Sequence, residues 1–410
     1  GTYAPGNNEP RVLPIAQSTT YVWESAADIA EVFDLKRDGH LYSRISNPTV
    51  AAFEGKIAAL EKGVGALATS SGQSAILVAI MNLCSAGDHI VASAKLYGGT
   101  VALLTNTLSK FGLRFTFVPP TATEAEIRAA CEPRTRLIYG ETISNPSLDV
   151  LDIARFAQAA HAVGVPLFVD NTFPSPYLCR PIEHGADVVI HSATKYIDGH
   201  AVSVGGVIVD GGTFDWTSGK YPGLSEPDAA HHGLRYTEQF GPAAFIMKAR
   251  AHLVRDFGCC MSPMNAWLSH LGLETLHVRM ERHSENALAL AQWLSVHPRV
   301  AWVEYPGLPG HRCHELARKY LPTGCGGVLS FGLKGGRDAA MRCIDTVQLA
   351  RLVTHVCDVR TSVIHPASTT HRQLTDEQLV AAGVLPELVR VSVGIEHIDD
   401  IRADFAQALS

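Results

Sequence analysis

Short apolar runs alternate with helical patterns between about residues 46 and 210. A repeated order of strand, helix and strand predicts an α/β fold whose mostly parallel central sheet is covered by helices on both faces. The helical patterns occupy residues 74–83, 100–111 and 153–163. We expect the strands at residues 65–69, 89–93, 114–118, 136–139, 166–170, 188–191 and 206–209.

The chain before this region is rich in Pro, Asn, Ser and Thr. We expect residues 1–45 to form an extended arm with one short helix at residues 26–34. Asn47 and Pro48 then open a helix, because the apolar residues that follow recur at helical spacing. The large domain is predicted to cover residues 46–242.

The pattern changes again after about residue 241. Long helical segments at residues 245–256 and 265–296 precede strands at residues 327–333 and 388–393. This order predicts a smaller α+β carboxyl-terminal domain over residues 243–410.

Composition narrows the class of protein. The chain has 410 residues, of which 46% are apolar, and a net charge of −6. High apolar content and small net charge exclude a disordered chain, and mild acidity argues against a nucleic-acid-binding surface. Only 18% of the residues are charged, which is below the roughly 25% usual for soluble domains. We interpret the difference as surface hidden in a subunit interface.

The cysteine pattern predicts a reducing, cytoplasmic environment. Nine cysteines are present, an odd number without a C-x-x-C pair, which is typical of free thiols. His311-Arg312-Cys313-His314 has no second ligand pair, so we interpret it as an exposed loop and predict no metal site. No apolar run approaches the ~18 residues of a membrane span, and the first residues carry no signal-peptide pattern.

Polar residues follow three of the predicted strands. Ser70-Ser71-Gly72-Gln73 follows the first, Asp170-Asn171-Thr172 follows the strand at 166–170, and His191-Ser192-Ala193-Thr194-Lys195 follows the strand at 188–190. Ligands of parallel sheets bind at the carboxyl ends of the strands. We therefore expect these three segments to meet at one site.

The residue types at these ends suit one cofactor. A lysine behind a buried strand suits imine chemistry, because burial lowers its pKa. Asp170 suits a protonated ring nitrogen, and the small-residue turn at Gly72 suits a phosphate, because free backbone N–H groups point outward there. Ser192 and Thr194 add hydroxyl donors. Together these groups describe a pyridoxal phosphate site, although each alone is also compatible with a surface lysine, a loop cap or a helix cap.

Linked motifs then show a family resemblance. From about Pro10 to the end, the chain resembles the cysteine/methionine-metabolism family of pyridoxal phosphate enzymes. The resemblance implies the fold of the aspartate aminotransferase type (fold type I). The motifs that carry it are Tyr42-Ser43-Arg44, Ser70-Ser71-Gly72-Gln73, Leu96-Tyr97-Gly98-Gly99-Thr100, Val169-Asp170-Asn171-Thr172, His191-Ser192-Ala193-Thr194-Lys195-Tyr196, Gly326-Gly327-Val328-Leu329-Ser330-Phe331, His365-Pro366-Ala367-Ser368-Thr369-Thr370-His371 and Ser392-Val393-Gly394-Ile395-Glu396.

The resemblance also implies roles at the cofactor. Lys195 would hold pyridoxal 5′-phosphate covalently and then move protons, Asp170 would keep the pyridine nitrogen protonated, and Tyr97 would stack on the ring. The phosphate would be held by Ser71, Gly72, Gln73, Ser192 and Thr194.

Further implied roles concern the substrate and a neighbouring subunit. Arg390 would grip the substrate α-carboxylate, with Thr361 nearby, and Asn145 would contact the cofactor's phenolic oxygen or the substrate. Glu141 would support the site from behind. Tyr42 and Arg44 would reach a neighbouring subunit's phosphate, and Tyr42 would also take part there in substrate binding and catalysis. Two purely structural interpretations stay open: the Tyr42–Arg44 segment could serve only as a packing arm, and Arg390 could pair with Glu396.

The later motifs are similar to the branch of the family that uses O-acetylhomoserine. They imply γ-replacement by sulfide or a small thiol, which gives homocysteine or methionine plus acetate in methionine biosynthesis. They also imply a homotetramer built from active dimers. Methionine γ-lyase is a sibling activity, but it would have cysteine where this chain has Gly99. Cystathionine γ-synthase is also open. A non-catalytic pyridoxal-phosphate-binding scaffold would not need Lys195, Asp170, Tyr97 and Arg390 all intact.

Overall fold

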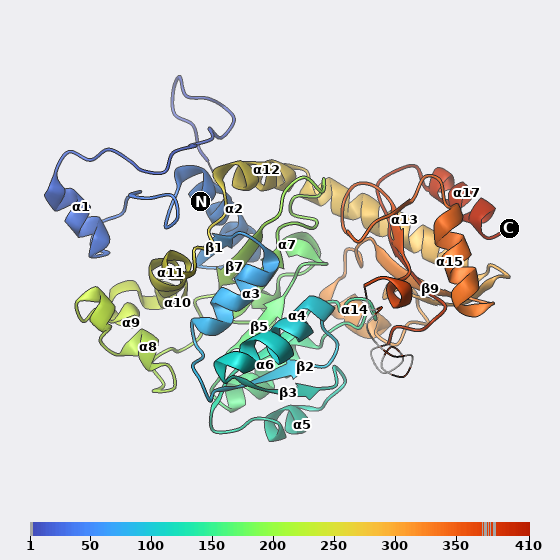
Figure 1. Ribbon diagram of the computed structural model, residues 1–410, viewed down its shortest axis with the longest axis horizontal. Coiled ribbons are helices and arrows are strands. Elements are labelled where there is room, and N and C mark those ends of the chain that lie inside the picture. Colours follow the sequence, from blue (N-terminus) through green and yellow to red (C-terminus); the bar gives the residue numbers. More distant parts are fainter. Residues whose placement is uncertain (1–2, 371, 373–374, 376, 378, 380–382) are drawn as a thin grey trace.

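Two sheets organise the molecule, one in each half (Figure 1). The computed structural model describes residues 3–370, 372, 375, 377, 379 and 383–410. The central sheet has seven strands in the order β1-β7-β6-β5-β4-β2-β3. Neighbours from β6 to β3 run parallel, whereas β7 is antiparallel to both β1 and β6. The strands are β1 (Gly65–Thr69), β2 (His89–Ser93), β3 (Arg114–Val118), β4 (Thr135–Glu141), β5 (Leu167–Asp170), β6 (Val188–Ser192) and β7 (Gly206–Asp210).

Helices cover both faces of this sheet, as the sequence pattern predicts. Successive side chains of a strand point to opposite faces. On β6, Val189 belongs to the core beneath α2 and α6, while Val188 and Ile190 belong to the core beneath α3. The longer helices of this half are α2 (Pro48–Glu61), α3 (Gly72–Met81), α5 (Glu124–Ala129) and α6 (Ile153–Ala162).

Local capping fixes where α2 begins. The Asn47 side-chain oxygen accepts hydrogen bonds from the backbone N–H groups of Thr49 and Val50, and Pro48 stands in the first turn. Both features are typical of a helix start, because the first N–H groups lack partners within the helix. Phe53 and Ile57 then point into the core.

The second sheet lies in the carboxyl-terminal half and has the order β10-β11-β12-β9-β8. Its core joins Leu290, Phe331 and Phe405 from a helix, a strand and the last helix. The strands are β8 (Val300–Glu304), β9 (Val328–Leu333), β10 (Arg351–Leu352), β11 (Ser362–Ile364) and β12 (Leu388–Ser392), and the helices are α13 (Leu276–Ser295), α14 (His314–Tyr320), α15 (Gly336–Thr346) and α17 (Ile398–Ala408).

The hydrophobic cores do not divide at a single point of the sequence, since the core that contains Ile57 also takes in Tyr320, Val328 and Cys357 of the carboxyl-terminal half. Phe245 of α10 packs in a core of the large domain, and Ala266 and Leu273 of α12 pack in the other. The carboxyl-terminal core begins at Ala287. The remaining helices and turns are α1 (Ala26–Phe33), α4 (Gly98–Ala102), η1 (Leu103–Thr107), η2 (Leu108–Phe111), α7 (Ser175–Leu178), η3 (Pro181–His184), α8 (Pro222–Ser225), η4 (Ala229–His231), α9 (Tyr236–Phe240), η5 (Gly241–Ala243), α10 (Ala244–Lys248), η6 (Ala249–Val254), α11 (Arg255–Phe257), α12 (Pro263–Glu274) and η7 (Pro366–Ser368).

Three predicted helices differ from the structure, one of them at 245–256, which passes from α10 through η6 into α11. The segment predicted as one helix at 265–296 is broken at Thr275, whose φ of −110° and ψ of 7° leave the helical region. Gly272 lets α12 pack closely against the segment after β6, because a Cβ on it would meet the backbone oxygens of Ile197 and Asp198 at 2.4 Å. The segment at 100–111 is also not one α-helix, because it passes from α4 into η1 and η2.

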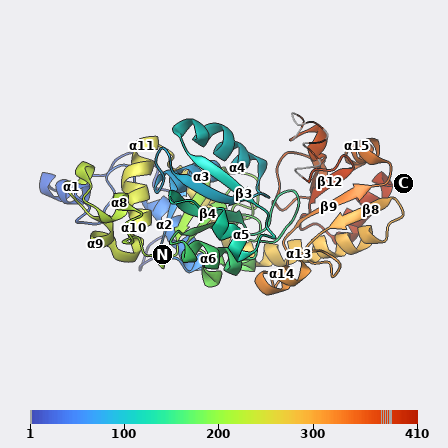
Figure 2. The same cartoon turned by 90° about the horizontal axis from the view of Figure 1, so that it is seen from below.

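The arm extends away from the sheet on the side opposite the carboxyl-terminal half (Figures 1 and 2). It contains the predicted short helix as α1. In the described part of the chain, no helix is both long and apolar enough to cross a membrane.

Candidate active site

A backbone cup forms where β1 passes into α3. The Ser71 hydroxyl caps α3 by accepting the N–H of Ser74 at 3.1 Å. Gly72 follows, and a Cβ on it would lie 2.8 Å from Cβ of Ser192. The glycine therefore lets the start of α3 approach the end of β6 closely.

The far wall of the cup is formed by the start of β7. A Cβ on Gly206 would lie only 2.0 Å from the Ser71 carbonyl oxygen. Thr194 is tied to the same wall, since its Oγ1 accepts the N–H of Gly205 at 3.1 Å and lies 3.2 Å from the Gly205 carbonyl oxygen. The structure thus brings Ser71, Gly72, Ser192 and Thr194 together.

Two carboxyl groups stand side by side at the ends of β4 and β5. Glu141 and Asp170 are register partners across these strands. Burial raises the pKa of both groups, and the Asp170 charge raises the pKa of Glu141 further. Hydrogen bonds from Thr172 and the charge of His191 oppose the rise in the Asp170 pKa. More groups that favour a charged carboxylate therefore face Asp170 than face Glu141.

Tyr97 lies between these carboxyl groups and the cup. Its backbone N–H donates to Oε1 of Glu141 at 2.7 Å, so Glu141 holds the start of the Tyr97 segment. Its ring is half exposed and lies over Gly99, where a Cβ would be 2.4 Å from Cε1 of Tyr97 and 3.1 Å from Nε2 of Gln73. Tyr97 and Gln73 thus share one side of the site.

Lys195 lies just after β6, and its amine faces the carboxyl-terminal domain. The Nζ atom is 3.3 Å from Nδ1 of His355. Burial, and after it the charge of Arg390, lower the pKa of the Lys195 amine. The amine is therefore more readily available as a neutral nucleophile than that of a surface lysine.

Arg390 of β12 is buried beside Lys195. Its Nη1 donates to Oδ1 of Asn145 at 3.0 Å, and within the described residues its buried Nε has no hydrogen-bond partner. Burial lowers the pKa of the guanidinium to about 10. A buried cation with an unused donor suits a carboxylate ligand.

Thr361, predicted near Arg390, forms a pair with Glu396. Thr361 is bound to Glu396, whose Oε1 accepts its N–H at 2.7 Å and whose Oε2 accepts its hydroxyl at 2.8 Å. Among the described residues no ion pair joins Arg390 to Glu396; Glu396 binds Thr361, and Nη1 of Arg390 binds Asn145. Thr361 also shapes the loop, since its Oγ1 accepts the N–H of Gly394 at 2.9 Å.

Tyr42 and Arg44 make their described contacts outside this cluster. The Arg44 guanidinium lies 5.3 Å from the Tyr42 ring centre and donates to the carbonyl of Arg255 in α11. Tyr42 is 42% exposed. Within this chain, Arg44 joins the arm to the large domain, and Tyr42 pairs with Thr20 inside the arm.

His355 and Glu61 contact residues of the site but belong to no sequence motif. His355 belongs to the carboxyl-terminal half, and no spacing relates it to Lys195. Behind Asp170, His191 and Glu61 form a fully buried pair with Nε2 and Oε1 2.6 Å apart, and Asn171 donates to the same Glu61 oxygen at 2.9 Å. The pair is invisible in sequence because 130 residues separate its members.

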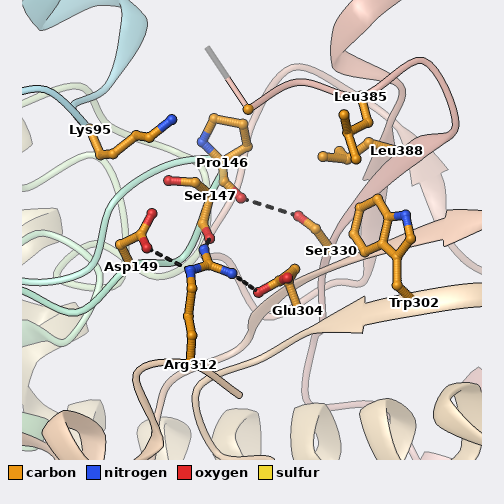
Figure 3. A pocket seen from close by; sticks show the side chains of 11 residues that line it. Lys95, Pro146, Ser147, Asp149, Trp302, Glu304, Arg312, Ser330, Leu385 and Leu388 are labelled. Atoms are coloured by element: carbon orange, nitrogen blue, oxygen red, sulfur yellow. Dashed lines mark hydrogen bonds and ion pairs between the residues drawn. The ribbon is translucent and has the colours of Figure 1, made fainter. Parts of the chain in front are cut away.

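A cavity of about 480 Å³ adjoins the site between the two domains (Figure 3). Its wall continues from the site, since Pro146 follows Asn145 and Ser330 is the register partner of Arg390. The Ser330 hydroxyl donates to the Pro146 carbonyl at 3.3 Å. The lining residues are Lys95, Pro146, Ser147, Asp149, Trp302, Glu304, Arg312, Ser330, Gly383, Leu385 and Leu388.

The segment at His311–His314 is not the exposed loop predicted from the sequence. His311 and Cys313 are buried, because the segment packs at the boundary between the domains. Arg312 ties the halves together through Nε to Oδ1 of Asp149 at 2.8 Å and through Glu304 of β8 (Figure 3). Among the described residues, no group of three or more His, Cys, Asp or Glu side chains is placed to hold a metal ion.

The residues present fit pyridoxal 5′-phosphate. The cup at Gly72 is a space that a Cβ would fill, Asp170 is a buried carboxylate, and Lys195 is an amine of lowered pKa next to a cation with a free donor. The fold and this site define a pyridoxal-phosphate-dependent enzyme. A model of the Cys/Met metabolism PLP-dependent enzymes matches residues 3–410, and the chain belongs to that family.

Comparison with individual proteins agrees with this family. The chain is 47% identical to an O-acetyl-L-homoserine sulfhydrylase of Leptospira meyeri, with 98% of this chain and 95% of the relative aligned. It is 50% identical to a homocysteine synthase of Schizosaccharomyces pombe, over 97% and 94% of the two chains. A crystal structure from Campylobacter jejuni, assigned as an O-acetylhomoserine (thiol)-lyase and carrying a pyridoxyl-phosphate-modified lysine, superposes with a TM-score of 0.96 at 35% identity, over 100% of this chain and 97% of that one. The predicted fold class and cofactor are confirmed.

Proposed function

We propose that the protein replaces the acetoxy group of O-acetyl-L-homoserine with sulfide or a small thiol, giving L-homocysteine or methionine plus acetate. The relatives named above, which align over nearly their whole length, support this activity. The observation that carries the proposal is the buried Arg390 beside Lys195, with Nε unused and Nη1 on Asn145. This arrangement suits an α-amino acid, whose carboxylate and amino group need a cation and a reactive carbonyl near each other.

The residues divide the work between orientation and proton transfer. Pyridoxal phosphate, when bound, supplies an electron sink for the carbanion at the substrate α-carbon. Lys195 would bond to the cofactor in the resting enzyme and, once released, would move protons at the substrate α- and β-carbons. Asp170 would hold the pyridine nitrogen protonated, and Tyr97 would stack on the ring face.

Other residues would hold the two anionic groups. Arg390 would bind the substrate α-carboxylate, with Asn145 fixing one arm of its guanidinium. Thr361 would act indirectly, by holding the Glu396 loop against the site. The cofactor phosphate would lie in the cup of Ser71, Gly72, Gln73, Ser192 and Thr194.

We further propose that Tyr42 and Arg44 complete the site of a neighbouring subunit. The arm that carries them extends away from the body (Figure 1). Val22 on this arm is fully exposed, and Val12 and Phe33 are 58% and 59% exposed. Because exposed apolar side chains mark surfaces that bind other proteins, the arm supports an active dimer, two of which would form a homotetramer. We place the enzyme in the cytoplasm, where its nine unpaired cysteines would stay reduced.

Gly99 favours this reaction over the γ-lyase of the same family. A side chain at this position would meet the Tyr97 ring, since even a Cβ would lie 2.4 Å from Cε1. The cysteine expected in methionine γ-lyase therefore does not fit the present arrangement of Tyr97.

A direct comparison of substrates tests the proposal. The purified holoenzyme is given O-acetyl-, O-succinyl- or O-phospho-homoserine with sulfide, methanethiol or cysteine, and separately methionine alone. We expect homocysteine from O-acetylhomoserine and sulfide to form fastest. Faster production of 2-oxobutyrate from methionine, or of cystathionine from cysteine, would contradict the assignment.

A further inference from the structure

The Lys195 amine has a neighbour from the other domain that no motif assigns. Its Nζ lies 3.3 Å from Nδ1 of His355, in the loop that joins β10 to β11. This loop is fastened directly to the lysine segment. The Val359 N–H donates to the Gly199 carbonyl at 2.9 Å, and the Gly199 N–H donates to the Lys195 carbonyl at 2.7 Å. The loop that carries His355 is therefore held next to Lys195 by backbone hydrogen bonds.

The other edge of the ring determines which nitrogen carries the proton. His355 Nε2 is buried, has no hydrogen-bond partner among the described residues, and lies 3.9 Å from Oδ2 of Asp358. A carboxylate near Nε2 favours the tautomer that is protonated there. In the neutral imidazole, the Nδ1 lone pair therefore points to the lysine nitrogen.

The surrounding charges favour a state in which the Lys195 amine and the His355 ring carry one positive charge between them rather than two. Burial lowers the pKa of both groups, and the Lys195 charge lowers the pKa of His355. Two cations 3.3 Å apart oppose each other strongly in a half-buried setting. The charged and titratable groups that face the pair are Asp358, Arg360 and Cys357 from its own loop, Asp198 from the segment after β6, and Arg390 from β12.

We propose that His355 is a positioning residue for Lys195, whose neutral Nδ1 holds the amine and takes one proton from it. One N–H bond breaks at Nζ and one forms at Nδ1, so the charge moves from ammonium to imidazolium and no other bond changes. The neutral Nζ then has a lone pair for the aldehyde carbon of the cofactor. The inference rests on the proposed assignment of Lys195 as the lysine that bonds pyridoxal phosphate.

The rate at which the cofactor-free protein takes up pyridoxal phosphate tests this inference. Uptake is followed by the visible absorbance of the bound cofactor from pH 6 to pH 9, in wild type, His355→Leu and His355→Asn. Asn offers an amide oxygen near the place of Nδ1 but takes up no proton. Thr354→Ala is the matched control, because Thr354 is an exposed residue of the same loop.

We expect the acidic limb of the rate profile to move up by about one pH unit in both His355 variants, so that uptake at pH 7 slows about tenfold. Thr354→Ala should follow wild type, and all these proteins should reach the same absorbance at pH 9. Lys195→Ala should give no such absorbance at any pH, which separates a failure of the Lys195 assignment from a failure of the His355 role. Profiles of His355→Leu and His355→Asn that match wild type would overturn the proposal, as would an equal shift in Thr354→Ala. If His355→Leu does not fold, His355→Asn decides.

A second measurement does not depend on turnover or on cofactor uptake. The ring of His355 is titrated by NMR in the cofactor-free protein, with its signal identified by its loss in His355→Asn. We expect its titration midpoint to rise in Lys195→Met, because the neighbouring cation is gone. An unchanged midpoint would contradict the contact on which the proposal depends.

Discussion

Arg390 and Asn145 are hydrogen-bonded across the two domains, with Nη1 3.0 Å from Oδ1 and 245 residues between them. One arm of the guanidinium is thereby fixed, and its Nε is left without a partner among the described residues. Among the described residues, the structure thus keeps a buried, oriented cation whose Nε donor is free for an anion.

Replacement of Arg390 by lysine tests that role. Lysine keeps the charge but has no planar fork for a bidentate carboxylate, and it leaves Asn145 without its donor. We expect kcat/KM for O-acetylhomoserine to fall about 100-fold, mainly through a higher KM. Steady-state kinetics measure this effect. Arg402→Lys on the remote helix α17 is the control and should behave as wild type, and an unchanged KM in Arg390→Lys would refute carboxylate binding.

Lys195→Ala should remove both the covalent link to the cofactor and turnover. The measurements are the visible absorbance of bound pyridoxal phosphate and mass spectrometry after borohydride reduction. The control is Lys248→Met, because Lys248 is a second buried lysine, whose pKa burial lowers to about 8. It lies away from the site and donates to the Asn82 carbonyl at 2.7 Å. If the reduced adduct mapped to Lys248 instead, the Lys195 assignment would fall.

Gly206→Ala should damage the phosphate cup. The added methyl group would lie 2.0 Å from the Ser71 carbonyl oxygen, so the backbone before α3 must move. We expect a loss of about 1–3 kcal/mol in stability from overpacking, together with about tenfold weaker cofactor binding. Gly310→Ala is the matched control, since nothing lies within 4 Å of a Cβ there. Thermal unfolding and cofactor titration compare the two, and equal behaviour would show that the cup tolerates the shift.

His283 should make the fold sensitive to acid. Burial is the main cause that lowers its pKa to about 4, against about 6.5 for a free histidine. The group is neutral when folded, so its contribution to stability is full above about pH 6.5 and is lost as the pH falls from 6.5 toward 4. Between pH 7.5 and 5.0 this costs about 2 kcal/mol of unfolding free energy.

Urea unfolding of the cofactor-free protein at these two pH values measures the effect. In His283→Asn the amide can still donate to the Val393 carbonyl, which lies 2.7 Å from Nδ1 in the native chain, but it does not titrate. The variant should therefore lose about 2 kcal/mol less than wild type between the two pH values. Equal losses in both proteins would assign the acid sensitivity to other groups.

Elements with a strong local signal could be predicted from the sequence, and long-range contacts could not. The strand at 65–69 agrees with the prediction because it holds a short apolar run, and the strand at 114–118 agrees because polar and apolar residues alternate along it. Asp170 and Lys195 stand out because each follows such a strand. The break at Thr275 could not be predicted, since it depends on Gly272 packing against a distant backbone segment.

The same reason explains the errors in the site. His311 and Cys313 look like loop residues until the two domains close over them. Arg390 and Glu396 have opposite charges and lie close in sequence, yet Glu396 binds Thr361, because the turn after β12 directs it there. The contact of His355 with Lys195 could not be predicted from the sequence, because it depends on which loop of the folded chain lies next to Lys195.

The loop that carries His355 has a consequence for protein engineering. It belongs by sequence to the carboxyl-terminal domain, where the Cys357 N–H donates to Ser392 Oγ at 2.7 Å, but Val359 fastens it to the large domain through Gly199. A chimera that exchanges whole carboxyl-terminal domains between relatives would therefore also exchange the immediate surroundings of the reactive lysine. Such hybrids should inherit the acid–base behaviour of Lys195 from the donor of the smaller domain, although the lysine itself comes from the other parent.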